Sequence, residues 1–134
     1  MQGVFLVPTN HVFQAWDSFE KYLADALVYA HGDITIDQLK ADIGQGRATL
    51  CAFVDEKPIG AAAIVFQNRR NSRVAFVLAI GGRGLLAPWC VEQFMALLKK
   101  EGATRVEGVG RDSIVRLWQR LGFRKKHTVF ELAL

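Results

Sequence analysis

Residues 73–90 read RVAFVLAIGGRGLLAPWC, and this stretch decides the fold. Its first eight residues are almost all apolar, which predicts a buried strand over residues 73–80. The glycine-rich segment Gly81–Ala87 follows, and glycine is typical of tight turns in which the backbone passes close to other atoms. Pro88 then suits the first turn of a helix, where a missing amide N–H costs nothing. The stretch therefore predicts a strand, a glycine-rich loop and a helix in direct succession.

Two further strands precede this stretch, each followed by a polar turn. Residues 48–54 and 59–66 are apolar and flank Asp55–Pro58, a pattern typical of a hairpin. The turn Asn68–Ser72 leads from the second strand into residues 73–80, so three antiparallel strands follow one another. Because these runs are almost continuously apolar, we expect both faces of the sheet to be covered.

The N-terminal third predicts one strand and two helices. Residues 4–7 form a short apolar run that reads as the strand. The first helix has Thr9 or Asn10 as its cap, and the second begins with the capping-box residues Thr35–Gln38. Apolar residues recur in the first helix at intervals of three and four until Gly32 breaks the pattern. They are Val12, Trp16, Phe19, Leu23, Ala26, Leu27 and Ala30.

The C-terminal third predicts a helix, a strand, another helix and a last strand. The first of these helices ends at Gly102, and Thr104–Val109 reads as a short strand. Asp112 or Ser113 caps the next helix, and residues 128–134 alternate as a strand does. The order β-α-α-β-β-β-α-β-α-β predicts an α+β domain with helices on both faces of one sheet.

Length and composition favour a single domain spanning residues 1–134. The chain is 51% hydrophobic and 22% charged, which suits a compact core and excludes a disordered protein. No apolar run approaches the roughly 20 residues of a membrane span. The first residues lack the basic cluster and apolar stretch of a secretory signal, so we expect a soluble, cytoplasmic protein. Cys51 and Cys90 are too few for a disulfide framework.

The net charge of +4 is unevenly distributed, with basic residues near the C-terminus and acidic residues in the first half. Such a surface attracts a phosphate-bearing ligand, a nucleic acid or an acidic protein, but a solvated basic face has the same pattern. No nucleic-acid-binding motif accompanies it. The basic C-terminal residues are Arg111, Arg116, Arg120, Arg124, Lys125 and Lys126.

The predicted order and three local features resemble the GNAT (Gcn5-related N-acetyltransferase) superfamily over essentially the whole chain. The loop Gly81–Ala87 lies where the family binds pyrophosphate, Ser113–Phe123 is similar to the family's fourth helix, and Phe130–Leu132 is similar to its closing strand. This resemblance implies a mixed, mostly antiparallel twisted sheet. More narrowly, six features resemble small bacteriophage-encoded GNAT-like proteins: Trp16, Thr35-x-Asp37-x-x-Lys40, Gly46-x-Ala48, Gly81-Gly82-Arg83, Trp89 and Gly110-Arg111.

The resemblance implies acetyl-CoA, or another acyl-CoA, as the cofactor. It places the acetyl carbonyl against the backbone of Leu78, Ala79 and Ile80. A helix N-terminus independently favours anions, and Arg83 would add a forked donor for phosphate. Leu86 replaces a glycine of the family's loop, and a plain strand-to-helix turn is the alternative interpretation. The implied phosphate-binding residues are Gly82, Arg83, Gly84, Leu85, Leu86 and Ala87, while Arg111 stands where the family carries an asparagine that helps hold the cofactor.

The catalytic positions depart from the family pattern. Trp118 occupies the place of the tyrosine that protonates the leaving thiolate, and an indole N–H cannot deliver a proton at ordinary pH. Residues 73–80 contain no carboxylate, although the family often places its base there. Glu107 and Glu131 are therefore the candidates for the general base. The alternative is that both are ordinary surface strand residues, paired with Arg105 or Lys126.

We predict structural roles, and no chemistry, for the histidines and cysteines of the chain. His11, His31 and His127 are scattered without the spacing of metal ligands, so we predict no metal site. Cys90 has no histidine partner nearby in the sequence, and Cys51 lies in the middle of a predicted strand. We interpret both cysteines as inert core residues.

Two functions from different classes remain open. The first is an acetyl-CoA-dependent N-acyltransferase with degenerate cofactor and catalytic motifs, which acts on an amine acceptor. The second is a non-catalytic bacteriophage virion or assembly component that uses the fold as a binding surface. Its partners would be phage structural proteins, and its location the host cytoplasm or the virion. The sequence leaves open whether the protein is an active enzyme and whether it forms oligomers.

Overall fold

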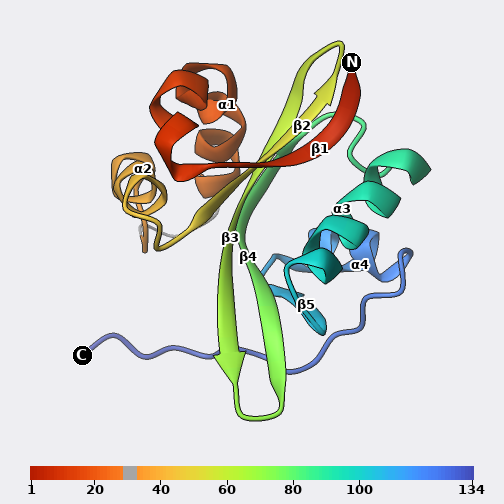
Figure 1. Ribbon diagram of the computed structural model, residues 1–134. Coiled ribbons are helices and arrows are strands. Elements are labelled where there is room, and N and C mark those ends of the chain that lie inside the picture. The colour runs from red at the N-terminus through yellow and green to blue at the C-terminus, as the bar shows by residue number, and fades with distance from the viewer. Residues whose placement is uncertain (29–32) are drawn as a thin grey trace.

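The computed structural model describes residues 1–28 and 33–134, and within them five strands form one sheet that four α-helices accompany (Figure 1). The structure does not describe residues 29–32, so three predictions fall outside the described residues. They concern His31, the end of the first helix at position 30 and the break at Gly32. In chain order the elements are β1 (Gln2–Val7), a short 3₁₀ turn (Thr9–His11), α1 (Val12–Leu27), α2 (Ile36–Gly44), β2 (Thr49–Asp55), β3 (Lys57–Arg69), β4 (Ser72–Gly82), α3 (Pro88–Lys100), β5 (Arg105–Gly108) and α4 (Asp112–Gln119).

The sheet has the order β1-β2-β3-β4-β5 and confirms the mixed, mostly antiparallel prediction. Neighbours from β1 to β4 are antiparallel, and only β4 and β5 run parallel. The hairpin of β3 and β4 is longer than predicted, because pairing continues to Arg69↔Ser72. Polar side chains stabilise this extension: Arg73 Nη1 donates to Asn68 Oδ1 at 2.9 Å, and Arg69 Nη2 donates to Gln67 Oε1 at 2.9 Å.

Helices cover both faces of the sheet, as predicted. Successive residues of β2 point to opposite faces, so Leu50 packs with α1 and α2 while Cys51 packs with α3. Figure 1 shows α1 and α2 on one side of the sheet and α3 on the other. The buried residues of the first cluster include Trp16, Leu23, Leu39 and Ile43, and those of the second include Phe53, Cys90, Phe94 and Leu98.

The helix caps are partly those predicted. The capping box of α2 is confirmed, since Thr35 Oγ1 accepts from Gln38 N at 3.1 Å and Gln38 Oε1 accepts from Thr35 N at 2.9 Å. The prediction that Thr9 or Asn10 caps the first helix is wrong. Both belong to a 3₁₀ turn in which the His11 N–H donates to the Pro8 carbonyl at 2.9 Å, and α1 begins only at Val12.

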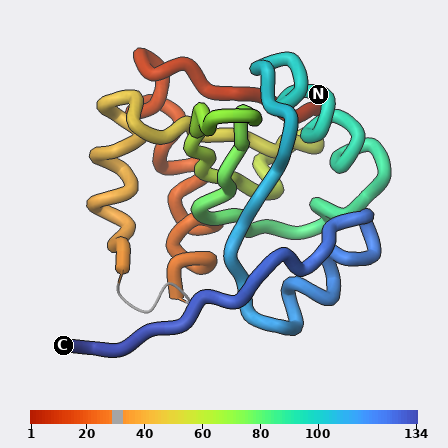
Figure 2. The backbone as a smooth tube through the Cα atoms, turned by 90° about the horizontal axis from the view of Figure 1, so that it is seen from below, coloured from red at the N-terminus to blue at the C-terminus, as the bar shows by residue number. Residues whose placement is uncertain are grey.

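The predicted last strand is absent from the described structure, where the chain after Gln119 forms neither helix nor strand. A strand needs a hydrogen-bonded neighbour, and none of the five strands of the sheet pairs with residues 128–134. Phe130 and Leu132 are 94% and 83% exposed, so the alternating pattern has no core to pack against. Figures 1 and 2 show this C-terminal segment crossing behind the β3–β4 hairpin and ending away from the sheet. The sheet therefore ends at β5.

None of the described helices is long and apolar enough to cross a membrane.

The same substitution at two leucines tests this assignment of core and tail. Leu39→Ala should lower the free energy of unfolding by about 2–5 kcal/mol, because it empties a fully buried position. Leu132→Ala should change it by less than about 0.5 kcal/mol, because that side chain is exposed. Urea unfolding of both variants measures the difference. A loss of several kcal/mol for Leu132→Ala would mean that the C-terminal segment is a packed strand.

Candidate functional site

The edge of β4 is open over its last residues. Pairing with β5 ends at Val77↔Gly108, while β4 continues to Gly82. Within the described chain, no strand lies beside residues 78–82 on that side, and only β3 pairs with them on the other. Backbone N–H and C=O groups on this edge can therefore hydrogen-bond an extended ligand. Leu78, Ala79 and Ile80, the residues expected to hold the acetyl group, lie on this open stretch.

The segment from Arg83 to Ala87 connects the open strand to α3. Arg83 N–H donates to the Ile59 carbonyl at 3.0 Å, and Ala87 N–H donates to the Gly84 carbonyl at 3.2 Å. No backbone hydrogen bond of the described residues uses the amides of Gly84, Leu85 or Leu86 as donors. These amides lie directly before the N-terminus of α3, where the helix dipole also favours negative charge.

Close packing explains the glycines at positions 81 and 82, at the end of β4, whereas Gly84 in the following segment has a different cause. A Cβ on Gly81 would lie 2.3 Å from the Tyr22 carbonyl oxygen of α1, and one on Gly82 would lie 2.3 Å from the Ile59 carbonyl oxygen. Gly84 has a φ of +71° and no atom within 4 Å of its Cβ position. The Gly81-Gly82 pair thus lets elements of the fold approach closely, whereas Gly84 forms a tight turn beside open space.

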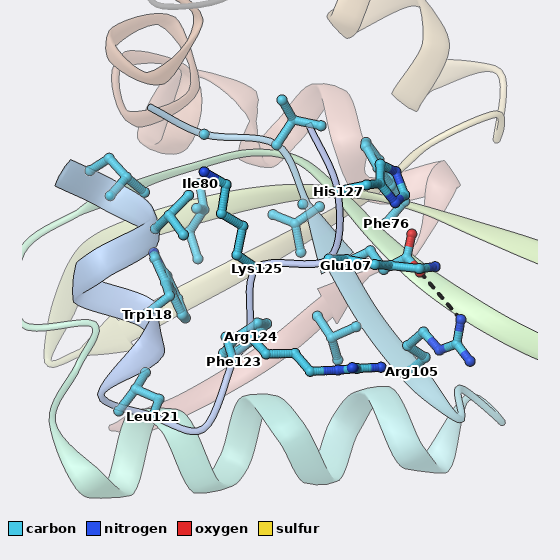
Figure 3. Close-up of a pocket in the computed structure, with 18 of the residues that line it drawn as sticks. Phe76, Ile80, Arg105, Glu107, Trp118, Leu121, Phe123, Arg124, Lys125 and His127 are labelled. Atoms are coloured by element: carbon cyan, nitrogen blue, oxygen red, sulfur yellow. Dashed lines mark hydrogen bonds and ion pairs between the residues drawn. The ribbon is translucent and has the colours of Figure 1, made fainter. Parts of the chain in front are cut away.

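A groove of about 680 Å³ lies between β4, β5, α4 and the C-terminal segment (Figure 3). Three predicted site residues line it: Ile80 from β4, Glu107 from β5 and Trp118 from α4. Trp118 packs edge-on against Phe123, with ring centroids 5.4 Å apart. Figure 3 shows Trp118 and Glu107 on opposite sides of Lys125. Ile80 lies on the open edge of β4 and also lines the groove, so this edge borders the groove.

Glu107 is surrounded by basic side chains. Its carboxylate accepts hydrogen bonds from Lys126 Nζ and Arg69 Nη1, each at 3.0 Å, and Arg105 Nη1 lies 3.6 Å away. The hydrogen bond from Lys126 and those from Arg69 lower the pKa of Glu107 from its ordinary 4.5 to about 2. A carboxylate held this firmly in its ionised form is a weak base at neutral pH. Glu107 thus forms ion pairs with both Arg105 and Lys126, the two partners that the sequence suggested for it.

The other predicted site residues do not line the groove: Leu78, Ala79 and the loop residues 82–87 lie on the open edge and the loop, and Glu131 and Arg111 lie elsewhere. Glu131 belongs to the exposed C-terminal segment and is not among the groove-lining residues. Arg111 precedes α4, and its carbonyl accepts the N–H groups of Ile114 and Val115 at 3.0 Å. The groove thus brings together Ile80, Glu107 and Trp118, but not the others.

Sequence reasoning missed most of the residues that line the groove, among them Phe76, Lys125 and His127. On the sequence alone we considered His127 only as a possible metal ligand, because the alternation of residues around it predicted a strand and not the lining of a groove. The described residues contain no group of three His, Cys, Asp or Glu side chains placed to hold a metal. Cys51 and Cys90 are buried, and burial raises the pKa of both thiols.

Glu107→Gln should lower the free energy of unfolding at pH 7, because it removes the charge that three basic side chains share. A carboxyl with a lowered pKa stabilises the fold above its unfolded value, and this contribution is lost as the pH falls through the folded value. The deficit of the variant should therefore shrink as the pH is lowered from 4.5 to about 2. Urea unfolding at several pH values measures it, with Glu92→Gln, an exposed position on α3, as the control. A deficit that grows toward low pH would contradict the assignment.

Comparisons with known proteins identify the fold. No family model matches the sequence, and no curated protein is significantly similar to it. Among solved structures, an aminoglycoside N-acetyltransferase in complex with CoA has a TM-score of 0.68 at 14% identity, covering 100% of this chain and 95% of that one. Glucosamine-6-phosphate N-acetyltransferase from Arabidopsis thaliana has a TM-score of 0.65 at 12% identity, covering 99% and 98%. A Trypanosoma brucei acetyltransferase has a TM-score of 0.63 at 13% identity, covering 100% of both.

These similarities extend over the whole chain but rest on very low sequence identity, so they establish the architecture and not the reaction. The agreement includes the mixed five-stranded sheet and the helices on its two faces. The chain has the fold of the GNAT acetyltransferases.

Proposed function

We propose that this GNAT acetyltransferase-like protein binds acetyl-CoA, or another acyl-CoA, along the open edge of β4 and transfers the acyl group to an amine. One observation carries the proposal: residues 78–82 of β4 have no strand partner on the β5 side and lead into a loop with available amides. The similar aminoglycoside N-acetyltransferase, which is in complex with CoA, supports the same cofactor class.

The residues of this edge and loop fit such a cofactor. The backbone of Leu78–Ile80 can hydrogen-bond its extended arm, and the amides of Gly84–Leu86 with the α3 N-terminus can bind its pyrophosphate. Arg83 is exposed beside them and would add a charged donor. Gly84 leaves open space where a Cβ would stand. When bound, acetyl-CoA supplies the thioester that carries the acetyl group.

The side chains of the groove set limits on the chemistry. Glu107 is committed to its ion pairs, and Trp118 can donate a hydrogen bond but not a proton. The amine proton would then pass to water or to the imidazole of His127, which lines the groove. We expect slow transfer rather than efficient catalysis.

A non-catalytic binding protein is the second candidate. The indole of Trp118 in place of an acid and the ion-paired state of Glu107 favour it. Nothing in the comparisons supports the narrower idea of a bacteriophage virion or assembly component.

Calorimetric titration with acetyl-CoA tests the cofactor site. We expect micromolar binding, and Arg83→Ala should weaken it roughly 10- to 150-fold, the range for one charge-assisted hydrogen bond. Arg70→Ala removes the same charge from the exposed β3–β4 turn and should leave the affinity unchanged. Absence of heat at millimolar acetyl-CoA with folded protein would reject the cofactor and favour the binding protein. Equal affinity for both variants would remove Arg83 from the site.

Replacement of Trp118 tests whether the missing acid limits the reaction. Trp118→Tyr should raise the rate of acetyl transfer at least tenfold, because general acid catalysis contributes about 10²–10⁴-fold. Trp118→Phe keeps an aromatic ring in the groove without a proton donor and serves as the control. Steady-state rates with a panel of amines measure both. If Trp118→Tyr is no faster than Trp118→Phe, Trp118 serves packing alone.

A further inference from the structure

One carboxylate shared by three basic side chains forms an unbalanced charge cluster on β3, β5 and the C-terminal segment. Arg69 and Lys126 contact Glu107 at 3.0 Å, and Arg105 lies at 3.6 Å. Three positive charges surround one negative charge, so the cluster keeps an excess of positive charge after its internal pairing. Like charges this close repel one another, and a further anion would offset that repulsion.

The excess charge faces solvent and the groove. The side chain of Glu107 is only 16% exposed, whereas those of Arg69, Lys126 and Arg105 are 38%, 41% and 49% exposed. The carboxylate therefore lies beneath the basic groups, whose outer donors remain accessible. Arg105 and Lys126 also line the groove, and Figure 3 shows Arg105 reaching toward Glu107 at one end of it. An arginine has five N–H donors, so one contact to Glu107 leaves others for a ligand.

The rest of the groove adds to this charge. Arg124 and Lys125 from the C-terminal segment line it as well, and Asp112 is the one acidic lining residue besides Glu107 among those described. Basic lining residues thus outnumber acidic ones. Ile80 and Trp118 are apolar lining residues near the open edge of β4, and Figure 3 shows the Lys125 side chain reaching toward Ile80. A ligand in the groove would therefore meet positive charge beside the apolar wall that Ile80 and Trp118 form.

We propose that Arg69, Arg105 and Lys126 bind an anionic group of the acceptor, so that the substrate is an amine bearing a carboxylate or a phosphate. That the anion belongs to an acceptor substrate rests on the proposed function, whereas the anion site itself does not. The Arg105 guanidinium and the Lys126 ammonium donate hydrogen bonds to the anion from the groove side. Glu107 holds these side chains in place from beneath and is a positioning residue. The amine of the substrate then lies toward Ile80, where the acyl group is expected.

Inorganic phosphate is the probe for the site in the full chain without cofactor. Titration followed by amide chemical shifts should show saturable changes at Glu107, Gly108 and Lys126. Arg105→Gln and Lys126→Gln should each weaken this binding about tenfold, as expected for loss of one charge-assisted hydrogen bond. Arg70→Gln, with the same change of charge in an exposed turn, should leave it unchanged. Changes confined to Gly84–Leu86, or an equal effect of all three variants, would overturn the anion site.

A second experiment separates this inference from the proposed function. Acetyl transfer to glycine and to glycinamide compares two amines that differ in the carboxylate. We expect kcat/KM to be at least tenfold higher for glycine, and Arg105→Gln to abolish that preference. Equal use of both amines by a protein that binds acetyl-CoA would overturn the inference and leave the proposed function standing. Phosphate binding at the cluster without any acetyl-CoA binding would support the anion site and reject the proposed function.

Discussion

The pairing of β4 with β5 stops after four residue pairs, and the arrangement of the candidate site depends on this limit. β5 ends at Gly108, where the chain turns away toward α4, while β4 continues to Gly82. The divergence leaves backbone groups of β4 without a strand on one side and opens the groove that α4 and the C-terminal segment border. Gly81 lets α1 approach the same stretch closely, so α1 packs against one face of the open strand.

The second property of the groove is an excess of positive charge, which is organised around Glu107. Glu107 contacts basic side chains from the β3–β4 hairpin, from β5 and from the C-terminal segment. The most distant of them in the sequence, Arg69, is 38 residues from Glu107. Its lowered pKa follows from these contacts and makes it an anchor for basic side chains instead of a proton acceptor. The groove thereby carries an excess of positive charge, next to the apolar side chains of Ile80 and Trp118. This charge favours an acceptor that bears an anionic group.

The sequence predicted the local features and missed those that depend on distant neighbours. Hydrophobic periodicity located the helices and antiparallel strands, and the Thr35–Gln38 spacing predicted a cap that the structure confirms. Alternation over residues 128–134 indicated a strand, but periodicity cannot supply the hydrogen-bonded partner that a strand requires. Likewise, the Glu107–Arg69 contact and the approach of Tyr22 to Gly81 arise from tertiary packing, which no local pattern records.

Binding of acyl-CoA to the open edge of β4 and the following loop is the proposal on which the function rests. Hydrogen–deuterium exchange of the full chain, with and without acetyl-CoA, is the measurement to make. We expect slower exchange for amides within residues 78–80 and 84–86 when acetyl-CoA is present, with little change on β1 or α2. Protection confined to other segments, or exchange that acetyl-CoA leaves unaltered throughout, would exclude an acyl-CoA site at this edge.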